Sequence, residues 1–376
     1  MRVVIITESY LPEINGVANS VARVASHLAA QGHEILIIAP RPSSKVEGPE
    51  PFPVIRLTSV PMPGYATVRL ALPTKKLGRI LAEFEPDVVH LASPFVLGSW
   101  GARAAEELGI PIVAIYQTDV PGYARAYRIG LTETLSWRVI QRLHQRATMT
   151  LAPSTATAAQ LSEHGVPRVG LWGRGVDTEL FHPSRRDKAL RHMLAPNKET
   201  IVGYVGRLAR EKEVHLLAGA SRLPGVKVVI IGDGPMRKPL QRQLPDAQFL
   251  GPKHGAELAR AYASLDLFVH TGPYETFCQT VQEAMSSGLP VIAPAAGGPV
   301  DLVADGQTGL LVPPHDEQAI AAAAAGLAGN PLRRKDMGRQ ARRAVAGRTW
   351  SALGEELVGH YTEAIATTRP RVLAAA

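Results

Sequence analysis

The chain has 376 residues, 45% of them hydrophobic and 20% charged, which is typical of a soluble globular protein and long enough for two domains. Its single cysteine excludes an intrachain disulfide framework and a zinc-finger spacing, and no apolar run approaches the ~20 residues that a membrane-spanning helix needs. The net charge of +8 leaves phosphorylated ligands and anionic membrane surfaces as candidate partners, whereas the lack of an RNA-recognition signature argues against nucleic acid.

The N-terminus predicts a buried strand, Val3–Thr7, and not a signal peptide, because the apolar run is short and Glu8 interrupts it. A loop with Asn15 and Gly16 then leads into a helix of about residues 17–30, and a second strand follows. The loop lacks the G-x-G-x-x-G fingerprint of dinucleotide-binding domains, which weakens an NAD-dependent function. Gly16 fits either a simple helix entry turn or a close backbone approach to a phosphate or sugar.

Basic residues flank the next predicted helix, which begins near Thr74 and carries Lys75, Lys76 and Arg79. The favoured interpretation is an ordinary surface helix, and the alternative is a basic amphipathic helix that rests on anionic lipid. A later helix, residues 132–146, has arginines at every fourth position. That pattern is most often a solvent-exposed face, with membrane or phosphate contact as the second interpretation.

Further strands at residues 86–91, 112–116 and 149–152 continue the alternation of strands and helices. Gln117 and Asp119 directly follow one of these strands. Because ligands of open parallel sheets bind at the carboxyl ends of the strands, we expect both side chains at a ligand crevice.

A polar, strongly charged segment, residues 184–200, separates the two halves of the chain and marks the predicted domain boundary. We therefore expect a first domain of residues 1–183 and a second of residues 184–350. Strands alternate with helices again in the second half, so each domain is predicted to contain a doubly wound parallel sheet. Residues 351–376 include a helix without a following strand, which we expect to cross back to the first domain.

Positive charge follows the first strand of the second domain, where Arg207 and Lys212 lie in or just after its loop. A tight turn, Gly232-Asp233-Gly234-Pro235, follows the next strand, and Phe277–Thr280 open a helix after a later one. The free N–H groups of that helix start, together with Arg207 and Lys212, would form a cationic site for a diphosphate. Surface charge is the alternative interpretation of the two basic residues.

Two glutamates, Glu275 and Glu283, flank seven residues around this helix start. A carboxylate beside a bound phosphate would repel it, so both are expected to hold hydroxyl groups, with Glu283 at a ribose. An exposed helical glutamate is the alternative for Glu283. The combination predicts a ligand with phosphate in the middle and a sugar at each end.

The motifs, in this order and at this spacing, resemble the retaining glycosyltransferases of family 4. The resemblance covers nearly the whole chain, and it implies the GT-B fold, an α/β architecture of two Rossmann-like domains facing across a cleft. The segments that carry it are Asn15-Gly16, Pro86–His90, Gly175–Asp177, Phe181–Pro183, Gly206-Arg207, Lys212, Gly232–Pro235, Glu275, Glu283–Val291 and Gly297-Gly298.

The resemblance implies a nucleotide-sugar donor held mainly by the second domain. Arg207 and Lys212 would neutralise its diphosphate and Glu275 would contact the transferred sugar, as the groups closest to the reaction. The implied donor-binding residues are Gly16, Gly232, Asp233, Phe277, Cys278, Gln279, Thr280 and Glu283, and those on the acceptor or sugar side are Asn15, Gln117 and Asp119.

Members of the family need no metal, and the donor is a co-substrate rather than a cofactor. They are thought to react on one face of the sugar, so Glu275 is interpreted as a positioning group and not as a nucleophile. Gln117 stands where many relatives have histidine, and it keeps a hydrogen bond to the sugar without an acid–base role. Cys278 stands where relatives often have glycine; a buried inert thiol is favoured over an activated thiolate at the phosphate site.

Within the family, residues 116–121 and 171–177 resemble the branch of GDP-mannose-dependent glycolipid mannosyltransferases and sulfoquinovosyl-diacylglycerol synthases. We therefore expect transfer of α-mannose from GDP-mannose to a lipid-linked sugar, by a cytoplasmic protein peripherally associated with the inner face of the plasma membrane. The alternatives are a UDP-sugar-dependent transferase acting on diacylglycerol or a small polyol, and a non-hydrolysing sugar-nucleotide epimerase. A non-enzymatic sugar-binding protein is disfavoured, because Arg207 and Lys212 would have no phosphate to bind.

Overall fold

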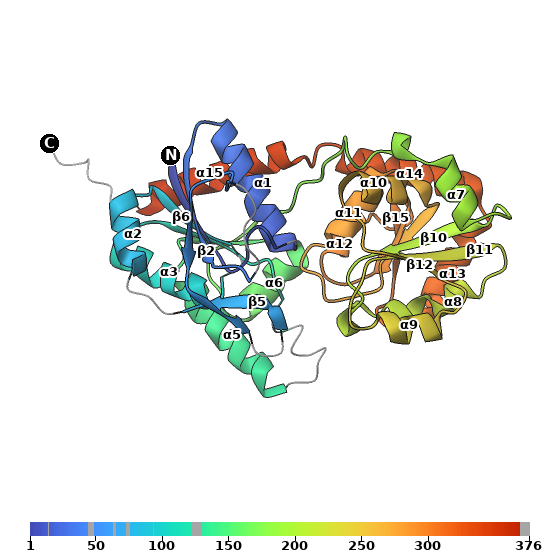
Figure 1. The fold of residues 1–376 in the computed structure, drawn as a ribbon, viewed down its shortest axis with the longest axis horizontal. Coiled ribbons are helices and arrows are strands. Elements are labelled where there is room, and N and C mark those ends of the chain that lie inside the picture. Colours follow the sequence, from blue (N-terminus) through green and yellow to red (C-terminus); the bar gives the residue numbers. More distant parts are fainter. Residues whose placement is uncertain are drawn as a thin grey trace. The chain divides into compact units, whose positions relative to one another are not determined.

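The computed structural model describes residues 1–13, 15–43, 49–62, 65–72, 76–92, 94–119, 121 and 130–368. Contacts within the chain divide it into two compact units, each built around a parallel sheet (Figure 1). Unit 1 comprises Met1–Pro121, Leu131–Arg174 and the C-terminal segment from Trp350, while Gly175–Thr349 make up the body of unit 2.

The strands of unit 1 are β1 (Arg2–Thr7), β2 (Glu34–Pro40), β3 (Val54–Leu57), β4 (Ser59–Met62), β5 (Tyr65–Ala71), β6 (Val88–Ala92), β7 (Ile112–Ile115), β8 (Met149–Ala152) and β9 (Val169–Leu171). Its helices are α1 (Gly16–Ala30), α2 (Lys76–Phe84), α3 (Val96–Glu107), α5 (Gly130–Gln145), α6 (Thr155–Glu163) and α15 (Trp350–Thr368).

The main sheet of unit 1 has the order β3-β2-β1-β6-β7-β8-β9 and is parallel throughout. Its central strands are continuous apolar runs because both faces are covered: Val3 and Ile5 pack under α1 and α15, and Val4 and Ile6 under α2 and α3. The strand order reverses between β1 and β6, so the loop that leads into α1 emerges at the switch point.

The strands of unit 2 are β10 (Thr200–Val205), β11 (Val226–Ile231), β12 (Gln248–Gly251), β13 (Leu267–Val269), β14 (Val291–Pro294) and β15 (Gly309–Val312). Its α-helices are α7 (Lys188–Leu194), α8 (Ala218–Ser221), α9 (Arg237–Gln243), α10 (Gly255–Ser264), α11 (Gln279–Ser286), α12 (Pro299–Leu302), α13 (Glu317–Ala328) and α14 (Pro331–Val345), and its 3₁₀ turns are η1 (Pro183–Arg185), η2 (Arg210–Lys212) and η3 (Val214–Leu217).

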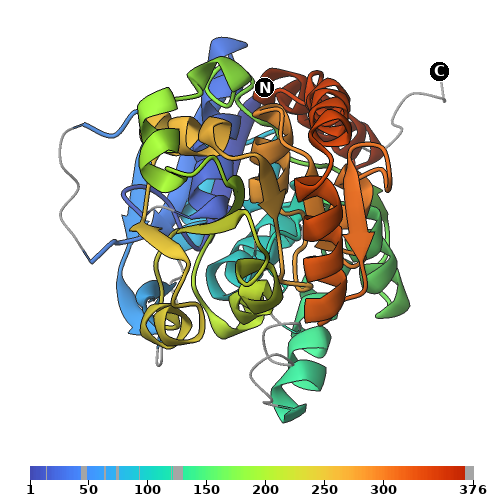
Figure 2. The same cartoon turned by 90° about the vertical axis from the view of Figure 1, so that its right-hand side faces the viewer.

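The sheet of unit 2 is also parallel, with the order β12-β11-β10-β13-β14-β15, and Figure 2 looks onto this unit. Alternate residues of β10 again enter two cores: Ile201 and Val205 on one face, Val202 and Tyr204 on the other. The order reverses between β10 and β13. The loops after these two strands are therefore neighbours, although dozens of residues separate them in the sequence.

The C-terminal helix α15 packs in unit 1, as expected from the sequence. Leu353, Leu357, Tyr361 and Ala364 form its buried stripe in the same core as β1 and α1. Trp172, which is 1% exposed, donates from its indole nitrogen to the Leu353 carbonyl at 2.8 Å.

Two details differ from the sequence-based expectation. The strands β3 and β9 and the antiparallel pair β4–β5 were not anticipated. The strands β3 and β9 are short and lie at the edges of the main sheet, and β4–β5 form a separate two-stranded sheet. In addition, Val176 and Phe181 belong to a core of unit 2, so contacts group residues 175–183 with that unit and not with residues 1–174.

None of the described helices is long and apolar enough to span a membrane.

Candidate functional site

The loops after β10 and β13 bring Lys212 and Glu275 together in unit 2. The Lys212 ammonium donates to Glu275 Oε1 at 2.5 Å, and both side chains are largely buried, at 15% and 19% exposed. Burial raises the pKa of Glu275, but the charge of Lys212 and a contact from His270 outweigh burial and hold this pKa well below its usual range. Glu275 is therefore an ionised, oriented carboxylate.

Two glycine turns make this arrangement possible by close backbone approach. Gly232 has φ +137°, and a Cβ there would lie 1.9 Å from the carbonyl oxygen of Gly206, next to Arg207. Gly297 has φ +60°, and a Cβ there would lie 2.4 Å from the Glu275 carbonyl, which also accepts the N–H of Gly298 at 2.8 Å. Only glycine fits such contacts, so the two turns clamp the loops that carry Arg207 and Glu275.

His270 lies buried behind Glu275, with its Nε2 at 3.0 Å from the Gly272 carbonyl oxygen and 3.4 Å from Glu275 Oε1. Burial lowers the pKa of His270, but the neighbours Cys278 and Glu275 raise this pKa by a larger amount. The net result is a pKa of about 10. The ring is then an imidazolium whose Nε2 donates to the Gly272 carbonyl and places a second positive charge 3.4 Å from the Glu275 carboxylate.

In the described part of the chain, His270, Glu275 and Cys278 form a group of potential metal ligands, with ligand atoms within 4.8 Å of one another. However, Lys212 already bonds the carboxylate of this group, and its histidine is held protonated. Both cations oppose a metal ion at this position. The residues of the group thus fit an oriented carboxylate better than a metal centre.

Glu283 lies in the second turn of α11 and has the opposite electrostatic environment. Burial raises its pKa to about 8, and hydrogen bonds with Tyr262 and Gln279 lower the pKa only partly. Tyr262 donates its hydroxyl to Glu283 Oε2 at 3.2 Å. Glu283 is therefore mainly protonated at neutral pH, and a carboxyl of this kind can both donate to and accept from hydroxyl groups.

The start of α11 has no side-chain cap. Its N-cap residue is Cys278, which has a left-handed backbone (φ 76°, ψ 70°) and is 4% exposed. The Cys278 sulfur lies 3.6 Å from the Thr280 hydroxyl, and Gln279 donates its amide to the Gly175 carbonyl at 3.0 Å. The helix start near Phe277 thus offers backbone N–H groups that no side chain of the N-cap residue occupies.

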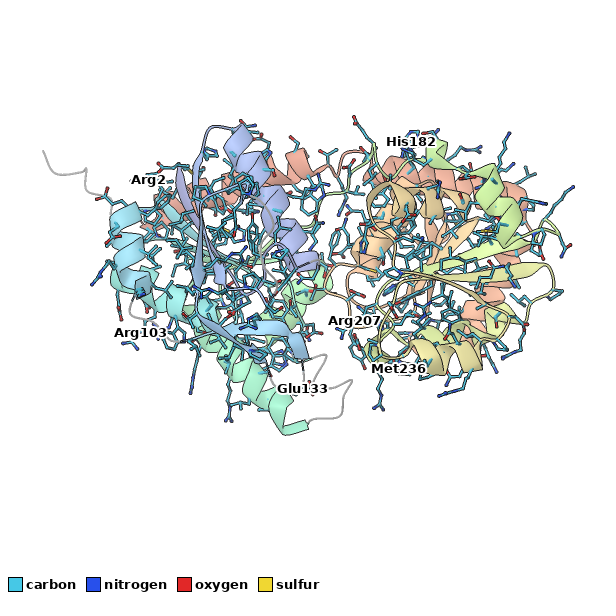
Figure 3. The ribbon with its side chains drawn as sticks, in the orientation of Figure 1. Arg2, Arg103, Glu133, His182, Arg207 and Met236 are labelled. Atoms are coloured by element: carbon cyan, nitrogen blue, oxygen red, sulfur yellow. The ribbon has the colours of Figure 1, made fainter. Side chains whose placement is uncertain are left out.

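Two further predicted residues lie near the surface of unit 2. Arg207 is exposed just after β10, at the edge of the unit where Figure 3 labels it. Asp233 is half-exposed; its carboxylate accepts the Gly234 N–H at 2.8 Å and lies 3.5 Å from Arg237. Asp233 therefore braces its own turn.

In unit 1, the structure brings Gly16 and Gln117 together around Arg174. Arg174 is only 8% exposed and donates to Gln117 Oε1 at 2.9 Å. A Cβ on Gly16 would lie 2.8 Å from Arg174 Nη1. Asn15 caps α1 by accepting the N–H groups of residues 17 and 18, at 3.1 and 2.9 Å. A guanidinium, a helix start and an amide therefore converge at the carboxyl edge of this sheet.

Asp119 and α2 carry the other residues that the sequence predicted in unit 1. The Tyr116 hydroxyl reaches Asp119 Oδ1 at 3.4 Å. Lys76 and Arg79 are exposed on α2, whereas Leu77 and Leu81 of the same helix are buried in the core. Lys75 lies outside the described residues.

Three residues of these sites were missed in the sequence: His270, Tyr262 and Arg174. His270 ends a predicted strand and could have been found as a polar residue at the carboxyl edge of a sheet. Tyr262 lies in the preceding helix α10 and carries no local signal. Arg174 lies in a segment where only its aromatic and glycine neighbours drew attention.

Two protein-family models match successive parts of the chain, and relatives of known name match most of its length. Residues 14–180 match the family model described as Glycosyltransferase Family 4, and residues 186–344 match Glycosyl transferases group 1. A GDP-mannose-dependent alpha-mannosyltransferase of Mycobacterium tuberculosis is 49% identical over 366 residues, 96% of each chain. An alpha-monoglucosyldiacylglycerol synthase of Acholeplasma laidlawii is 28% identical over 84% of this chain and 86% of that protein. The structure of a sucrose-phosphate synthase from Thermosynechococcus elongatus is similar with a TM-score of 0.81 at 22% identity, covering 97% of this chain and 99% of that chain.

Proposed function

Because this chain belongs to the glycosyltransferases described as Family 4 and group 1, we propose that it transfers α-mannose from GDP-mannose to a lipid-linked sugar acceptor. The fold is GT-B, with the two Rossmann-like domains that the motifs predicted. The observation that carries the donor is the 49% identity, along nearly the whole chain, with a protein named for GDP-mannose. The likeness to a protein named alpha-monoglucosyldiacylglycerol synthase supports a lipid acceptor.

The chemistry proposed for unit 2 is stabilisation of the departing GDP. The bond between C1 of the mannose and the β-phosphate oxygen breaks, the acceptor oxygen bonds to C1 on the same face, and the acceptor proton passes to the departing phosphate. Lys212 and Arg207, with the N–H groups at the start of α11, would stabilise the developing phosphate charge. This role supports metal-independent transfer, since the charges that a metal would supply are already present in Lys212 and His270.

Glu275 is proposed to position the mannose rather than to attack it. Its carboxylate is tied to Lys212 at 2.5 Å and to His270 at 3.4 Å, which lowers its nucleophilicity and fixes its direction toward sugar hydroxyls. A covalent mannosyl adduct trapped on Glu275 would overturn this role.

The remaining site residues are proposed to bind the ends of the donor and the acceptor. Glu283 would exchange hydrogen bonds with the ribose. The turns that would lie nearest the nucleotide contain Gly232, Asp233, Phe277, Cys278, Gln279 and Thr280. In unit 1, Gly16 would approach the donor, Gln117 would contact the transferred sugar, and Asn15 and Asp119 would face the acceptor. Arg174 joins this set because it orients Gln117 through its hydrogen bond.

A lipid-linked acceptor requires contact with a bilayer. We propose peripheral association with the anionic inner face of the plasma membrane, which the net charge of +8 supports. The protein would then meet GDP-mannose on the cytoplasmic side.

A donor screen tests the function. Purified protein is incubated with a membrane lipid extract and one donor, which is GDP-mannose, GDP-glucose, UDP-glucose or UDP-galactose. The masses of the lipid products are measured by mass spectrometry. The expected result is a lipid heavier by one hexose with GDP-mannose alone, unchanged by a metal chelator. Turnover with UDP-glucose but not GDP-mannose would reject the donor, and loss of activity in chelator that added metal restores would reject the metal-independent route. Conversion of a donor without any acceptor would favour an epimerase.

A further inference from the structure

Helix α5 has one face in the core of unit 1 and one face in solvent. Trp137, Ile140 and Leu143 are between 4% and 7% exposed and pack into the hydrophobic cores. On the opposite face, Leu135 is 60% exposed and Val139 is 38% exposed. The two exposed apolar residues lie one helical turn apart, so they form a single patch rather than scattered positions.

Arginines occupy the same exposed stripe. Arg138 and Arg142 are exposed and alternate with Leu135 and Val139 at the spacing i, i+3, i+4 and i+7. Within the described residues, neither arginine forms an ion pair with a carboxylate. Arg146, one turn further on, pairs with Glu106. The stripe therefore combines apolar side chains with unneutralised positive charge.

Helix α2, for which membrane contact was considered from the sequence, lacks this combination. Its apolar residues Leu77 and Leu81 are buried, which leaves Lys76 and Arg79 exposed together with the acidic Glu83. Charge without exposed apolar surface is typical of a solvated helix face. The basic helix α14 of unit 2 exposes one large apolar residue, Leu332 in its first turn, and the residues that follow on that stripe, Lys335, Asp336 and Arg339, are charged and of mixed sign.

The exposed stripe of α5 is also accessible. In both Figure 1 and Figure 2, the N-terminal part of α5 extends beyond the sheet and the other helices of unit 1. Glu133, labelled in Figure 3, marks that end of the helix. The side chains on the solvent side of α5 can therefore meet a flat surface before the rest of the unit does.

We propose that the stripe Leu135, Arg138, Val139 and Arg142 is the surface of α5 that docks onto an anionic bilayer. The leucine and valine would enter the boundary between headgroups and acyl chains, and the arginines would stay at the lipid phosphates. The inference rests on the proposed function, because a lipid acceptor has to be reached from the bilayer. It assigns the contact to α5 and not to α2.

Co-sedimentation with vesicles tests the assignment. The full-length protein is mixed with vesicles of phosphatidylcholine alone or with one-third phosphatidylglycerol. The variants are Arg138→Glu/Arg142→Glu, Leu135→Ser/Val139→Ser, and the control Lys76→Glu/Arg79→Glu, which reverses the same amount of charge on α2. Wild-type protein is expected to bind the anionic vesicles preferentially. The charge reversal on α5 should weaken that binding at least about tenfold, and the Leu135/Val139 variant several-fold, with the α2 control close to wild type.

Equal binding of the wild type and both α5 variants, or selective loss in the α2 control, would overturn the proposal. A change from dimer to monomer in Leu135→Ser/Val139→Ser, with vesicle binding intact, would assign the stripe to a second copy of the chain and also overturn it. Unchanged thermal unfolding of the variants excludes misfolding as the cause.

A separate assay distinguishes this inference from the proposed function. Transfer from GDP-mannose to acceptor lipid in detergent micelles needs no bilayer, so both α5 variants should retain it there while losing transfer on vesicles. Transfer by the wild-type protein in micelles, without binding of the wild type to vesicles, rejects the docking surface alone. Vesicle binding without transfer from GDP-mannose rejects the proposed function and leaves the surface standing.

Discussion

Two glutamates of one loop-and-helix segment differ in ionisation because of their immediate neighbours. Glu275 lies against the Lys212 ammonium and the His270 ring, which keep it charged. Glu283 is half-buried beside the Tyr262 hydroxyl, no described cation forms an ion pair with it, and its pKa rises to about 8. Residue type alone assigns the same charge to both, so the environment decides which one is a fixed negative charge and which can donate a proton to a ligand.

The raised pKa of Glu283 predicts a pH-dependent cost to stability. In the unfolded chain this carboxyl ionises near its usual value of 4.5, whereas in the folded protein it stays protonated up to about pH 8. Between these values the unfolded state binds fewer protons, so stability falls as pH rises from about 4.5 to 8. Glu283→Gln removes this loss and should raise the melting temperature by a few degrees at pH 8, with little change at pH 4.

The same variant should bind GDP-mannose about tenfold more weakly, because an amide replaces the carboxyl proposed to meet the ribose. Calorimetry at pH 4 and pH 8 and donor titration measure the two effects. A melting temperature of Glu283→Gln below that of the wild type at pH 8 would contradict the assigned pKa.

Gly16 is predicted to matter for activity and not for stability. A methyl group there would lie 2.8 Å from Arg174 Nη1, so Gly16→Ala should displace the guanidinium and break its hydrogen bond to Gln117. Because the guanidinium is the end of a flexible side chain, stability should change by less than about 1 kcal/mol. We expect kcat/KM for GDP-mannose to fall at least about tenfold.

Gly78→Ala is the matched control, since Gly78 lies in α2 and an added Cβ there meets nothing within 4 Å. Equal activity of the Gly16 and Gly78 variants in a steady-state assay would remove Gly16 and Arg174 from the proposed site.

At the scale of elements, the contact of α15 with β6 includes a buried polar pair. His90 Nδ1 and the Tyr361 hydroxyl lie 2.5 Å apart, and burial lowers the pKa of His90 to about 3. His144 of α5 is similar, with a pKa lowered by burial to about 4. These helices therefore pack onto the sheet of unit 1 through histidines that must stay neutral.

The lowered values predict acid sensitivity. An unfolded histidine gains a proton below its usual pKa of 6.5, whereas the folded His90 gains one only near pH 3. The unfolded state thus binds more protons in this range, and stability falls as pH drops from about 6.5 toward 3. His90→Phe/Tyr361→Phe removes one histidine without leaving the tyrosine hydroxyl unpaired. Denaturant titrations between pH 7 and pH 4 should show a shallower decline in its free energy of unfolding than in wild type.

Some decline should remain in that double variant, because His144 is still present. The single variant His90→Phe serves as a control: it should show the same shallower slope but lower stability at pH 7, by about 1–3 kcal/mol, through the unpaired hydroxyl. A slope identical to that of the wild type would show that His90 does not couple folding to pH.

At the scale of the whole molecule, the two units differ in how continuous they are in sequence. The body of unit 2 is the single segment Gly175–Thr349, whereas unit 1 needs α15 from the far end of the chain. Leu353, Leu357 and Tyr361 fill the core that β1 and α1 share. A protein fragment of residues 175–349 should therefore fold alone, and one of residues 1–174 should not.

The fragments provide the test. Residues 175–349 should show a cooperative thermal transition, and residues 1–174 should bind a hydrophobic dye and aggregate, because the core of unit 1 is left open. Adding residues 350–368 to the fragment of residues 1–174 through a flexible linker should restore a cooperative transition. Cooperative unfolding of residues 1–174 without α15 would contradict the role given to that helix.

The sequence by itself determined the alternation of strands and helices, the two parallel sheets and the C-terminal helix. These depend on local signals: apolar runs such as Val3–Thr7, helical spacing, and glycine or proline at ends. It also indicated Lys212, Glu275 and Glu283, because the strand order of a doubly wound sheet brings particular loops to one edge.

The tertiary structure decided what those residues are chemically. The ion pair between Lys212 and Glu275 joins two loops that are far apart in the chain. The neutral state of Glu283 comes from burial against Tyr262, which lies on another helix. Arg174 became part of a site only because Gly16 leaves room for it. The charge of an ionisable group depends on solvent exclusion and on neighbours in space, and neither is encoded at its own position in the chain.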